Sequence, residues 1–362
     1  MATQEQLLTA LQTVIDPNTG KDFVSSKALK NLTIDGASVS FEIELGYPAK
    51  SQIGEFRAAL IAAAKTVAGV DNVSVNLHLK VLPHAVQRGV QLLPGVKNII
   101  AVASGKGGVG KSTTAANLAL ALAAEGASVG LLDADIYGPS QPMMMGLSGK
   151  PESTDGKTME PMENYGVQVM SIGFLVEPDQ AMIWRGPMAT QALEQLLRQT
   201  NWRELDYLIV DMPPGTGDIQ LTLSQRVPLT GAVIVTTPQD IALLDAKKGI
   251  KMFEKVGVPI LGIVENMAVH ICSQCGHQEH IFGSEGGKKM ADEYKMDYLG
   301  ALPLDMQIRL QADGGKPTVV ADPDGEVAAI YKTVARQVAV SVSLRNRDFS
   351  SKFPSITISK DT

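Results

Sequence analysis

The pattern of apolar and polar positions divides the chain into two parts, with a change near residue 98. In the first part, apolar residues alternate with polar ones or recur at helical spacing, which predicts strands and helices in turn. The predicted helices cover 3–15 and 51–69, and the predicted strands cover 39–48 and 71–81. Ser51 is expected to cap the second helix and Gly69 to end it. We therefore predict a small α+β domain over residues 1–81, followed by a proline-containing linker over 82–97.

Beyond residue 98, apolar runs of four to eight residues, without a polar residue at every second position, alternate with helical segments. The runs are IIAVAS, VGLLDAD, VQVMSIG, YLIVDMPP, AVIVTTP, ILGIVENM and the weaker DYLGALP. Such runs are typical of strands that helices cover on both faces of a sheet. Their alternation with helices predicts a mostly parallel sheet with right-handed crossovers, and hence an α/β domain over residues 98–344. A helix over 324–343 closes this domain, and a polar tail follows over 345–362.

The composition is ordinary for a globular protein. The 362 residues carry a net charge of −6, and no stretch without Asp, Glu, Lys or Arg is longer than 14 residues. An acidic chain does not favour nucleic acid or an anionic lipid surface, and the longest uncharged stretch is too short to span a bilayer. The first basic residue is Lys21, so no secretory signal is expected. We expect a cytoplasmic protein, where two neighbouring cysteines are more often a metal or redox site than a disulfide.

The segment GKGGVGKST, residues 105–113, follows a predicted strand and precedes a predicted helix. It fits the P-loop pattern G-x-x-x-x-G-K-[ST], in which backbone N–H groups turn toward phosphate oxygens at a helix N-terminus. The nucleotide-binding residues predicted from it are Gly105, Lys106, Gly107, Gly108, Val109, Gly110, Lys111, Ser112 and Thr113. Lys111 is expected to reach the β- and γ-phosphates, and the Ser112 hydroxyl to bind Mg²⁺. A glycine-rich turn without a ligand is the alternative.

Acidic residues follow two further predicted strands. Asp211 ends a buried run, where a carboxylate needs a cation or hydrogen bonds, and it occupies the Walker B position that holds Mg²⁺. The N–H of Gly215, four residues later, is expected to approach the γ-phosphate. Asp133 and Asp135 end the second strand of the domain. We predict that Asp135 orients the attacking water and that Asp133 supports the metal, the alternative being a solvated carboxylate at a strand end.

The lysine that follows Gly105 narrows the type of P-loop. The stretch KGGVGKST resembles the deviant Walker A motif of the ParA/MinD class of dimeric ATPases. The resemblance implies that Lys106 reaches the nucleotide of the opposite subunit in an ATP-linked dimer. An ordinary surface lysine is the alternative.

Further motifs resemble the Mrp (ApbC-type) iron–sulfur cluster carriers over nearly all of residues 98–340. The motifs are DADIYGPSQP, DMPPGTGD, TTPQDIALLDAKKGI, GIVENM and CSQCGHQEHIFG. The resemblance implies that Asn266 reads the adenine edge and that backbone near Pro303 borders the base. The first part of the chain resembles a small domain that often precedes the ATPase in bacterial members. Relatives of that domain commonly carry a cysteine where this chain has LGYPAKS, so no cluster chemistry is expected of residues 1–81.

The two cysteines of the chain, Cys272 and Cys275, lie in one short polar loop. A [4Fe–4S] cluster commonly takes four thiolates, and a symmetric dimer of this chain has four. We therefore predict that the cysteines bridge one cluster across a homodimer interface. A dimer-bridging zinc ion, a dithiol redox pair and two free thiols are the alternatives. The nearby His270, His277 and His280 are expected to be loop residues rather than ligands.

Together these predictions describe a homodimeric ATPase that binds ATP and Mg²⁺, holds a [4Fe–4S] cluster and transfers it to apoproteins. Its predicted catalytic residues are Lys106, Lys111, Asp135 and Asp211. Its predicted partners are a second copy, cluster donors and iron–sulfur apoproteins, with neither nucleic acid nor membrane. Two alternatives share the P-loop: a spatial-organising ATPase, which would not need the cysteines, and an ATP-driven iron–sulfur reductase, which would.

Overall fold

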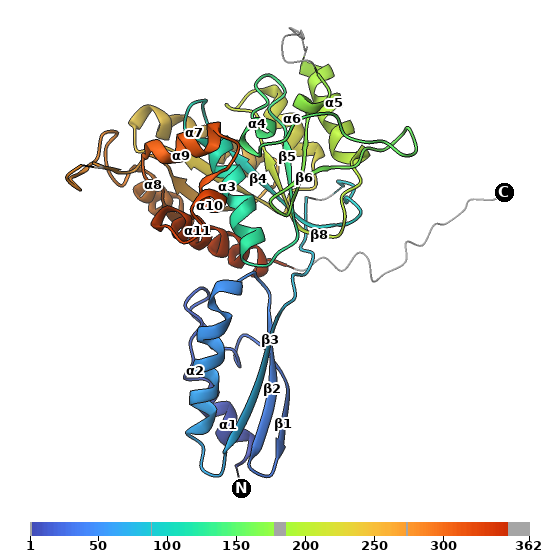
Figure 1. The fold of residues 1–362 in the computed structure, drawn as a ribbon. Coiled ribbons are helices and arrows are strands. Elements are labelled where there is room, and N and C mark those ends of the chain that lie inside the picture. Colours follow the sequence, from blue (N-terminus) through green and yellow to red (C-terminus); the bar gives the residue numbers. More distant parts are fainter. Residues whose placement is uncertain (1, 88, 177–185, 273, 347–362) are drawn as a thin grey trace, which may run out of the picture.

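The computed structural model of the chain describes residues 2–87, 89–176, 186–272 and 274–346. The predicted polar tail lies outside these residues from position 347 onward. Figure 1 shows a slender N-terminal part that extends from one end of a broader C-terminal part. Among the described residues, none of the helices combines the length and the apolar composition needed to cross a bilayer.

Within residues 2–87, a three-stranded sheet is covered on one face by helices (Figure 1). The elements are α1 (Gln4–Leu11), β1 (Leu29–Asp35), β2 (Ser38–Leu45), the 3₁₀ helix η1 (Lys50–Gln52), α2 (Ile53–Lys65) and β3 (Asn72–Leu79). β2 lies in the centre, antiparallel to β1 and parallel to β3. Its alternate residues Val39, Phe41, Ile43 and Leu45 are buried, which confirms that the alternating pattern marks one core face of a strand.

Two local features of this part differ from the sequence prediction. The apolar pattern does not predict β1, because a register shift between Lys30 and Thr33 interrupts its alternation, and Asn31 there has a φ of +50°. Ser51 was expected to cap the helix, but it lies inside η1, and α2 begins two residues later without a side-chain cap. The Ser51 hydroxyl instead contacts Glu125 of the C-terminal part.

The C-terminal part follows the predicted alternation of strands and helices. Its strands are β4 (Val96–Ala103), β5 (Val129–Asp133), β6 (Met162–Asn164), β7 (Val167–Ser171), β8 (Leu205–Asp211), β9 (Gly231–Thr236), β10 (Ile260–Glu265), β11 (His270–Ile271), β12 (Gln278–Glu279) and β13 (Tyr298–Ala301). Its helices are α3 (Lys111–Ala124), α4 (Gln141–Met144), the 3₁₀ helix η2 (Ile172–Phe174), α5 (Gly186–Gln199), α6 (Asp218–Arg226), α7 (Asp240–Lys255), α8 (Gly286–Tyr294), α9 (Met306–Asp313), α10 (Thr318–Ala321) and α11 (Glu326–Ser343).

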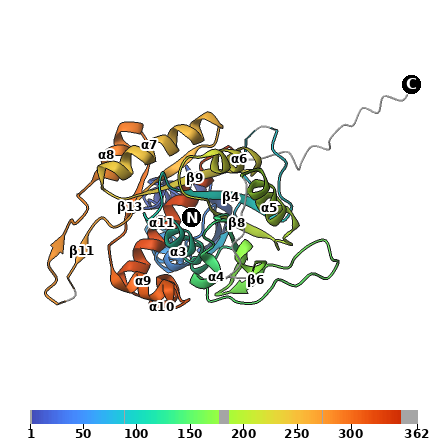
Figure 2. The same cartoon turned by 90° about the horizontal axis from the view of Figure 1, so that it is seen from above.

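The large sheet confirms the predicted α/β fold. As far as the structure describes it, the sheet has eight strands in the order β13–β10–β9–β4–β8–β5–β7–β6, and all neighbours are parallel except β6 and β7. Figure 2 shows α3, α9, α10 and α11 on one face of the sheet and α5 to α8 on the other. All residues of β5 and β9 are buried, as expected for strands covered on both sides. The short edge strand β6 has too few residues to show a pattern.

The two parts of the chain meet at the C-terminal end of α3. Glu125, the residue that follows this helix, is 1% exposed. Its carboxylate accepts hydrogen bonds from the Ser51 hydroxyl at 2.7 Å and from Arg336 Nη1 of α11 at 2.7 Å. A buried carboxylate that is paired in this way anchors η1 to the helix whose other end carries the P-loop.

Candidate functional site

The P-loop lies between β4 and α3, at the carboxyl edge of the sheet. Gly110 has a φ of +82°, and a Cβ at this position would lie 2.1 Å from Nδ2 of Asn266. A Cβ on Gly105 would lie 2.1 Å from the backbone carbonyl carbon of Asp245 in α7. Glycine is therefore required at both ends of the loop, because other segments of the chain approach it closely.

Lys111, Ser112 and Asp211 form one cluster, as the P-loop and Walker B assignments predict. The Lys111 ammonium group is buried, donates a 3.1 Å hydrogen bond to Ser112 Oγ, and pairs with the Asp211 carboxylate. Asp211 is fully buried at the end of β8. A buried carboxylate beside a buried ammonium group and a hydroxyl gives a site whose charges and oxygen ligands suit phosphate and Mg²⁺.

Gln141, the first residue of α4, belongs to this cluster although the sequence pattern did not single it out. Its side chain is fully buried, and Nε2 donates to Asp211 Oδ2 at 2.9 Å and to the Ser112 carbonyl oxygen at 3.0 Å. Its backbone N–H donates to Asp133 Oδ2 at 3.1 Å. No partner among the described residues satisfies its Oε1 atom. Gln141 lies within the DADIYGPSQP motif, but no spacing rule assigns it a role, and the fold shows its contacts with the P-loop and Asp211.

Asp133 and Asp135 occupy different environments at the end of β5. Asp133 is fully buried, and its carboxylate accepts from the backbone N–H of Asp135 at 3.2 Å and from Ser171 Oγ at 3.0 Å. Burial, with the nearby Asp211 charge second, raises the pKa of Asp133 to about 7. Asp135 is half-buried, and burial raises its pKa while Lys111 opposes the rise. Backbone hydrogen bonds reach both carboxylates, and Asp133 is the more deeply buried of the two.

Gly215 lies beside the P-loop, and Lys106 lies within it. The Gly215 N–H donates to the Ser104 carbonyl oxygen at 3.1 Å, and its φ is +92°. Its approach to a phosphate stays a prediction, and this bond would have to open for it. Lys106 is half-buried and makes no ion pair with any residue that the structure describes. Its reach into a second subunit stays a prediction.

Asn266 and Pro303 lie at the ends of neighbouring strands, β10 and β13. Asn266 is buried, and its Nδ2 donates to the Val109 carbonyl oxygen of the P-loop at 2.9 Å. Pro303 is buried next to Leu302, whose N–H donates to the Glu265 carbonyl oxygen at 2.9 Å. The structure thus brings Asn266 against the P-loop, and the adenine contacts of both residues stay predictions.

The short polar loop with the two cysteines joins the strands of a hairpin, β11 and β12. β11 pairs with β12 through His270 and Glu279, and the Cys272 N–H donates to the His277 carbonyl oxygen at 2.9 Å. Cys272 is half-buried and Cys275 is exposed. Hydrogen bonds from the backbone N–H groups of Gln274 and Cys275 lower the pKa of the Cys272 thiol, which favours the thiolate form that metals bind.

The histidines of this hairpin hold its arms in place. His270 Nδ1 lies 3.0 Å from the Leu304 carbonyl oxygen, and His280 Nδ1 lies 2.7 Å from the Ala268 carbonyl oxygen. A carbonyl oxygen only accepts, so both rings carry a proton on Nδ1. No group of three or more His, Cys, Asp or Glu side chains within residues 2–87, 89–176, 186–272 and 274–346 is placed to hold a metal ion. Each hairpin therefore presents two thiols, and their binding of a metal stays a prediction.

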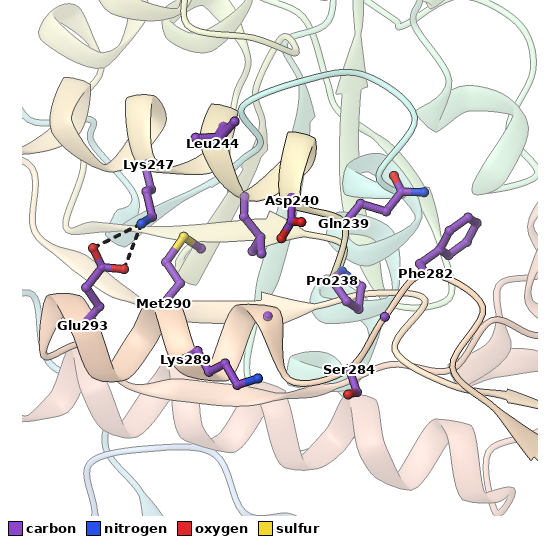
Figure 3. Close-up of a pocket in the computed structure, with 13 residues that line it drawn as sticks. Pro238, Gln239, Asp240, Leu244, Lys247, Phe282, Ser284, Lys289, Met290 and Glu293 are labelled. Carbon is purple, nitrogen blue, oxygen red and sulfur yellow. Dashed lines mark hydrogen bonds and ion pairs between the residues drawn. The ribbon is translucent and has the colours of Figure 1, made fainter.

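A cavity of about 550 Å³ opens between α7, α8 and the segment that returns from the hairpin. Figure 3 shows Pro238 and Phe282 at one end of it, and the ion pair of Lys247 with Glu293 at the other. Its lining contains no residue of the P-loop and neither cysteine. The cavity is therefore a neighbour of the two predicted sites and not part of either.

Comparison with known proteins identifies the family. The model of the NUBPL iron-transfer P-loop NTPases matches residues 95–339, which hold the P-loop, the acidic cluster and the cysteine hairpin. The chain belongs to this family. A second model, for an iron–sulfur cluster assembly protein, matches residues 4–76 in the N-terminal part. The chain is thus a P-loop NTPase, as its loop predicts.

Relatives of this iron-transfer NTPase are similar over most of their length. A protein of Pseudomonas fragi named iron–sulfur cluster carrier protein is 59% identical over 75% of this chain and 96% of its own. A protein of the same name from Haemophilus influenzae is 48% identical over 94% of this chain and 92% of its own. The structure of a nucleotide-binding protein from Archaeoglobus fulgidus in complex with ADP has 39% identity and a TM-score of 0.57, and it covers 65% of this chain and 91% of that one.

Proposed function

We propose that this chain is an ATP-hydrolysing carrier that holds a [4Fe–4S] cluster between two copies of itself and passes it to apoproteins. The observation that carries the proposal is the position of Cys272 and Cys275 on one exposed hairpin, a few residues beyond Asn266, whose side chain contacts the P-loop. The names of the Pseudomonas and Haemophilus relatives support the same role.

The nucleotide half of the function uses the cluster around Lys111. Lys111 binds the β- and γ-phosphates, which compete with Asp211 for its ammonium group. Ser112, Asp211 and the supporting Asp133 supply the oxygen atoms for Mg²⁺, and that ion neutralises phosphate charge when bound. Asp135, which is less buried than Asp133, orients the water that attacks the γ-phosphate. Lys106 completes the site of the second subunit, and it is half-buried with no ion pair in the described chain to hold it.

Binding of the iron–sulfur cluster uses the cysteine hairpin of each subunit. Two chains supply four thiolates, the number that a [4Fe–4S] cluster takes. Cys275 is exposed and Cys272 has a lowered pKa, so both suit a cluster that is bound reversibly at a surface. Cluster donors and iron–sulfur apoproteins in the cytoplasm are the partners of such a carrier, and neither nucleic acid nor membrane is part of the role.

A transfer assay tests this proposal. The chain is reconstituted anaerobically with iron and sulfide, and an apo-enzyme that needs a [4Fe–4S] cluster is then added. We expect the acceptor to gain activity at least as fast as with free iron and sulfide, and to do so when a chelator scavenges iron from solution. Cys275→Ala should abolish the chelator-resistant gain. A gain that persists in Cys275→Ala, or that the chelator suppresses fully, contradicts a carrier role.

A further inference from the structure

Glu265 and Asn266 are consecutive residues at the carboxyl end of β10. Asn266 contacts the P-loop, and Glu265 contacts the first turn of α8. Asn266 holds the P-loop, since its Nδ2 donates to the Val109 carbonyl oxygen at 2.9 Å and its backbone N–H donates to the Thr236 carbonyl oxygen at 2.7 Å. Glu265 is 2% exposed, and its Oε2 accepts the backbone N–H of Gly287 in the first turn of α8. One short segment therefore joins the nucleotide loop to the start of a helix.

The Glu265 contact replaces a local helix cap. The residue before α8, Glu285, has a φ of +57° and makes no capping hydrogen bond with its side chain. Glu265, 22 residues before Gly287, provides the acceptor instead. A carboxylate is well suited to this place, because the N-terminus of a helix carries a partial positive charge. The first turn of α8 is thereby tied to the end of β10.

The cysteine hairpin is the segment that this contact closes. It leaves β10 after Asn266 and returns to α8 at Gly286, so Glu265 joins the two ends of the loop that carries both thiols. Its outgoing arm is held by the Ala268 N–H, which donates to the Leu302 carbonyl oxygen at 3.0 Å. Its returning arm packs on Pro238, because a Cβ on Gly286 would lie 2.8 Å from the Pro238 carbonyl oxygen. Figure 3 shows Pro238 close to the returning segment that carries Phe282 and Ser284.

We infer that Glu265 is a positioning residue that fixes the cysteine hairpin, and that the Asn266–Val109 contact makes the hairpin sensitive to the nucleotide. The path from Val109 to the first turn of α8 consists of two hydrogen bonds and one peptide link, and the hairpin with the two cysteines lies between Asn266 and Gly287. A nucleotide that moves the P-loop carbonyl of Val109 moves Asn266, and Glu265 moves with it. The inference rests on the proposed function, since the hairpin would control a bound iron–sulfur cluster. The contacts from which it is drawn involve neither a cluster nor iron.

Thiol alkylation of the iron-free, reduced protein tests the inference. Rates at Cys272 and Cys275 are measured by mass spectrometry with N-ethylmaleimide, with no nucleotide, with Mg-ADP and with a non-hydrolysable Mg-ATP analogue. In the native chain we expect the nucleotide to change at least one rate by about fivefold or more, the lower end of ordinary coupling between sites. In Glu265→Ala the ratio should fall to less than about twofold, with nucleotide affinity unchanged.

Two matched variants separate positioning from general damage. Glu285→Gln removes an exposed carboxylate beside the same helix turn, and it should keep the native ratio. Glu265→Gln keeps the volume and an acceptor oxygen, and it should keep part of the ratio. A native ratio in Glu265→Ala overturns the inference, and so does a native chain whose thiols do not respond to nucleotide.

A measurement on the native chain covers the case in which Glu265→Ala does not fold. Hydrogen exchange of residues 286–290 should change when nucleotide binds, and unchanged exchange there overturns the inference. The inference and the carrier role also fail separately. If the thiols respond to nucleotide but no cluster binds, the inference stands and the carrier role is refuted. If a cluster binds but the thiols do not respond to nucleotide, the inference is refuted and the carrier role stands.

Discussion

The side-chain nitrogen of Gln141 lies 2.9 Å from Oδ2 of Asp211 and 3.0 Å from the carbonyl oxygen of Ser112. One buried amide thus joins Asp211, the last residue of β8, to Ser112, the residue after the P-loop lysine. The backbone of the same residue donates to Asp133. Gln141 therefore fixes Ser112, Asp133 and Asp211 relative to one another. Its position in the sequence did not predict this role.

Gln141→Ala should lower both the stability and the ATPase activity. It leaves the buried Asp211 without one donor, which costs about 1–3 kcal/mol of unfolding free energy. Without the Gln141 amide, the Asp211 carboxylate is no longer held in one position. ATP hydrolysis should therefore slow roughly tenfold, which corresponds to about 1.4 kcal/mol in the barrier. Urea denaturation and steady-state phosphate release measure the two effects. Gln191→Ala, on an exposed position of α5, should change neither, and native hydrolysis in Gln141→Ala would show that the amide contributes nothing.

The buried Asp133 predicts a fall of stability with rising pH. Its pKa is about 7 in the folded chain because of burial and then Asp211, against about 4 in an unfolded chain. The folded state holds the proton more tightly, so this stabilisation is complete below the lower value and is lost as the pH rises toward 7. Asp133→Asn stays neutral, and its unfolding free energy should therefore fall less than that of the native chain between about pH 5 and pH 8.

Urea denaturation in buffer without Mg²⁺ measures this slope. Asp35→Asn, which alters an exposed aspartate in the N-terminal part, is the control and should follow the native pH dependence. If Asp133→Asn also follows it, the carboxylate of Asp133 is not the group that titrates.

The contact between Glu125 and Arg336 predicts how strongly the two parts of the chain are joined. The Glu125 side chain is 1% exposed and that of Arg336 12%. Glu125→Ala leaves a largely buried guanidinium group without its partner, which should cost about 3–5 kcal/mol. Calorimetry should show the N-terminal part unfolding at a lower temperature than the rest. As a control, Glu254→Ala breaks an exposed pair with Lys251 and should cost less than about 1 kcal/mol. Equal costs in the two variants would mean that the buried pair of Glu125 and Arg336 stabilises the protein no more than a surface pair does.

The nucleotide site and the cysteine hairpin should be separable by mutation. Lys111→Ala removes the buried ammonium group and should abolish ATP hydrolysis, while iron binding after reconstitution stays native. Cys272→Ala should lose the bound iron and keep the basal rate of hydrolysis. Lys288→Ala, on an exposed position of α8, is the control for both assays. Iron retained in Cys272→Ala would contradict the bridging of a cluster by this thiol.

Much of the fold could be predicted because its strands are strongly patterned. The runs VGLL and GAVIV are apolar throughout, and the structure buries every residue of the strands β5 and β9 that contain them. The P-loop could be predicted because its glycines and lysine occupy fixed spacings between a strand and a helix. In these places the local sequence and the global fold demand the same residues.

The features that could not be predicted depend on contacts between distant segments. Gln141 and Glu265 act through partners that lie 70 and 22 residues away, and no local pattern encodes such a pairing. Serine is a residue type that often caps helices, but the Ser51 hydroxyl donates a hydrogen bond to the Glu125 carboxylate instead. The hairpin around Cys272 has strands of only two residues each, too short for alternation to be seen.

The sharing of one cluster by two chains is tested most directly by the iron and acid-labile sulfide content of the protein, measured with its mass in solution after anaerobic reconstitution. If two hairpins share one cluster, the protein should be a dimer with about four iron and four sulfide ions per two chains, and Cys272→Ala should lose all of them. About one zinc ion per dimer with no sulfide, or a full cluster bound to a monomer, would contradict the proposal that two hairpins share one [4Fe–4S] cluster.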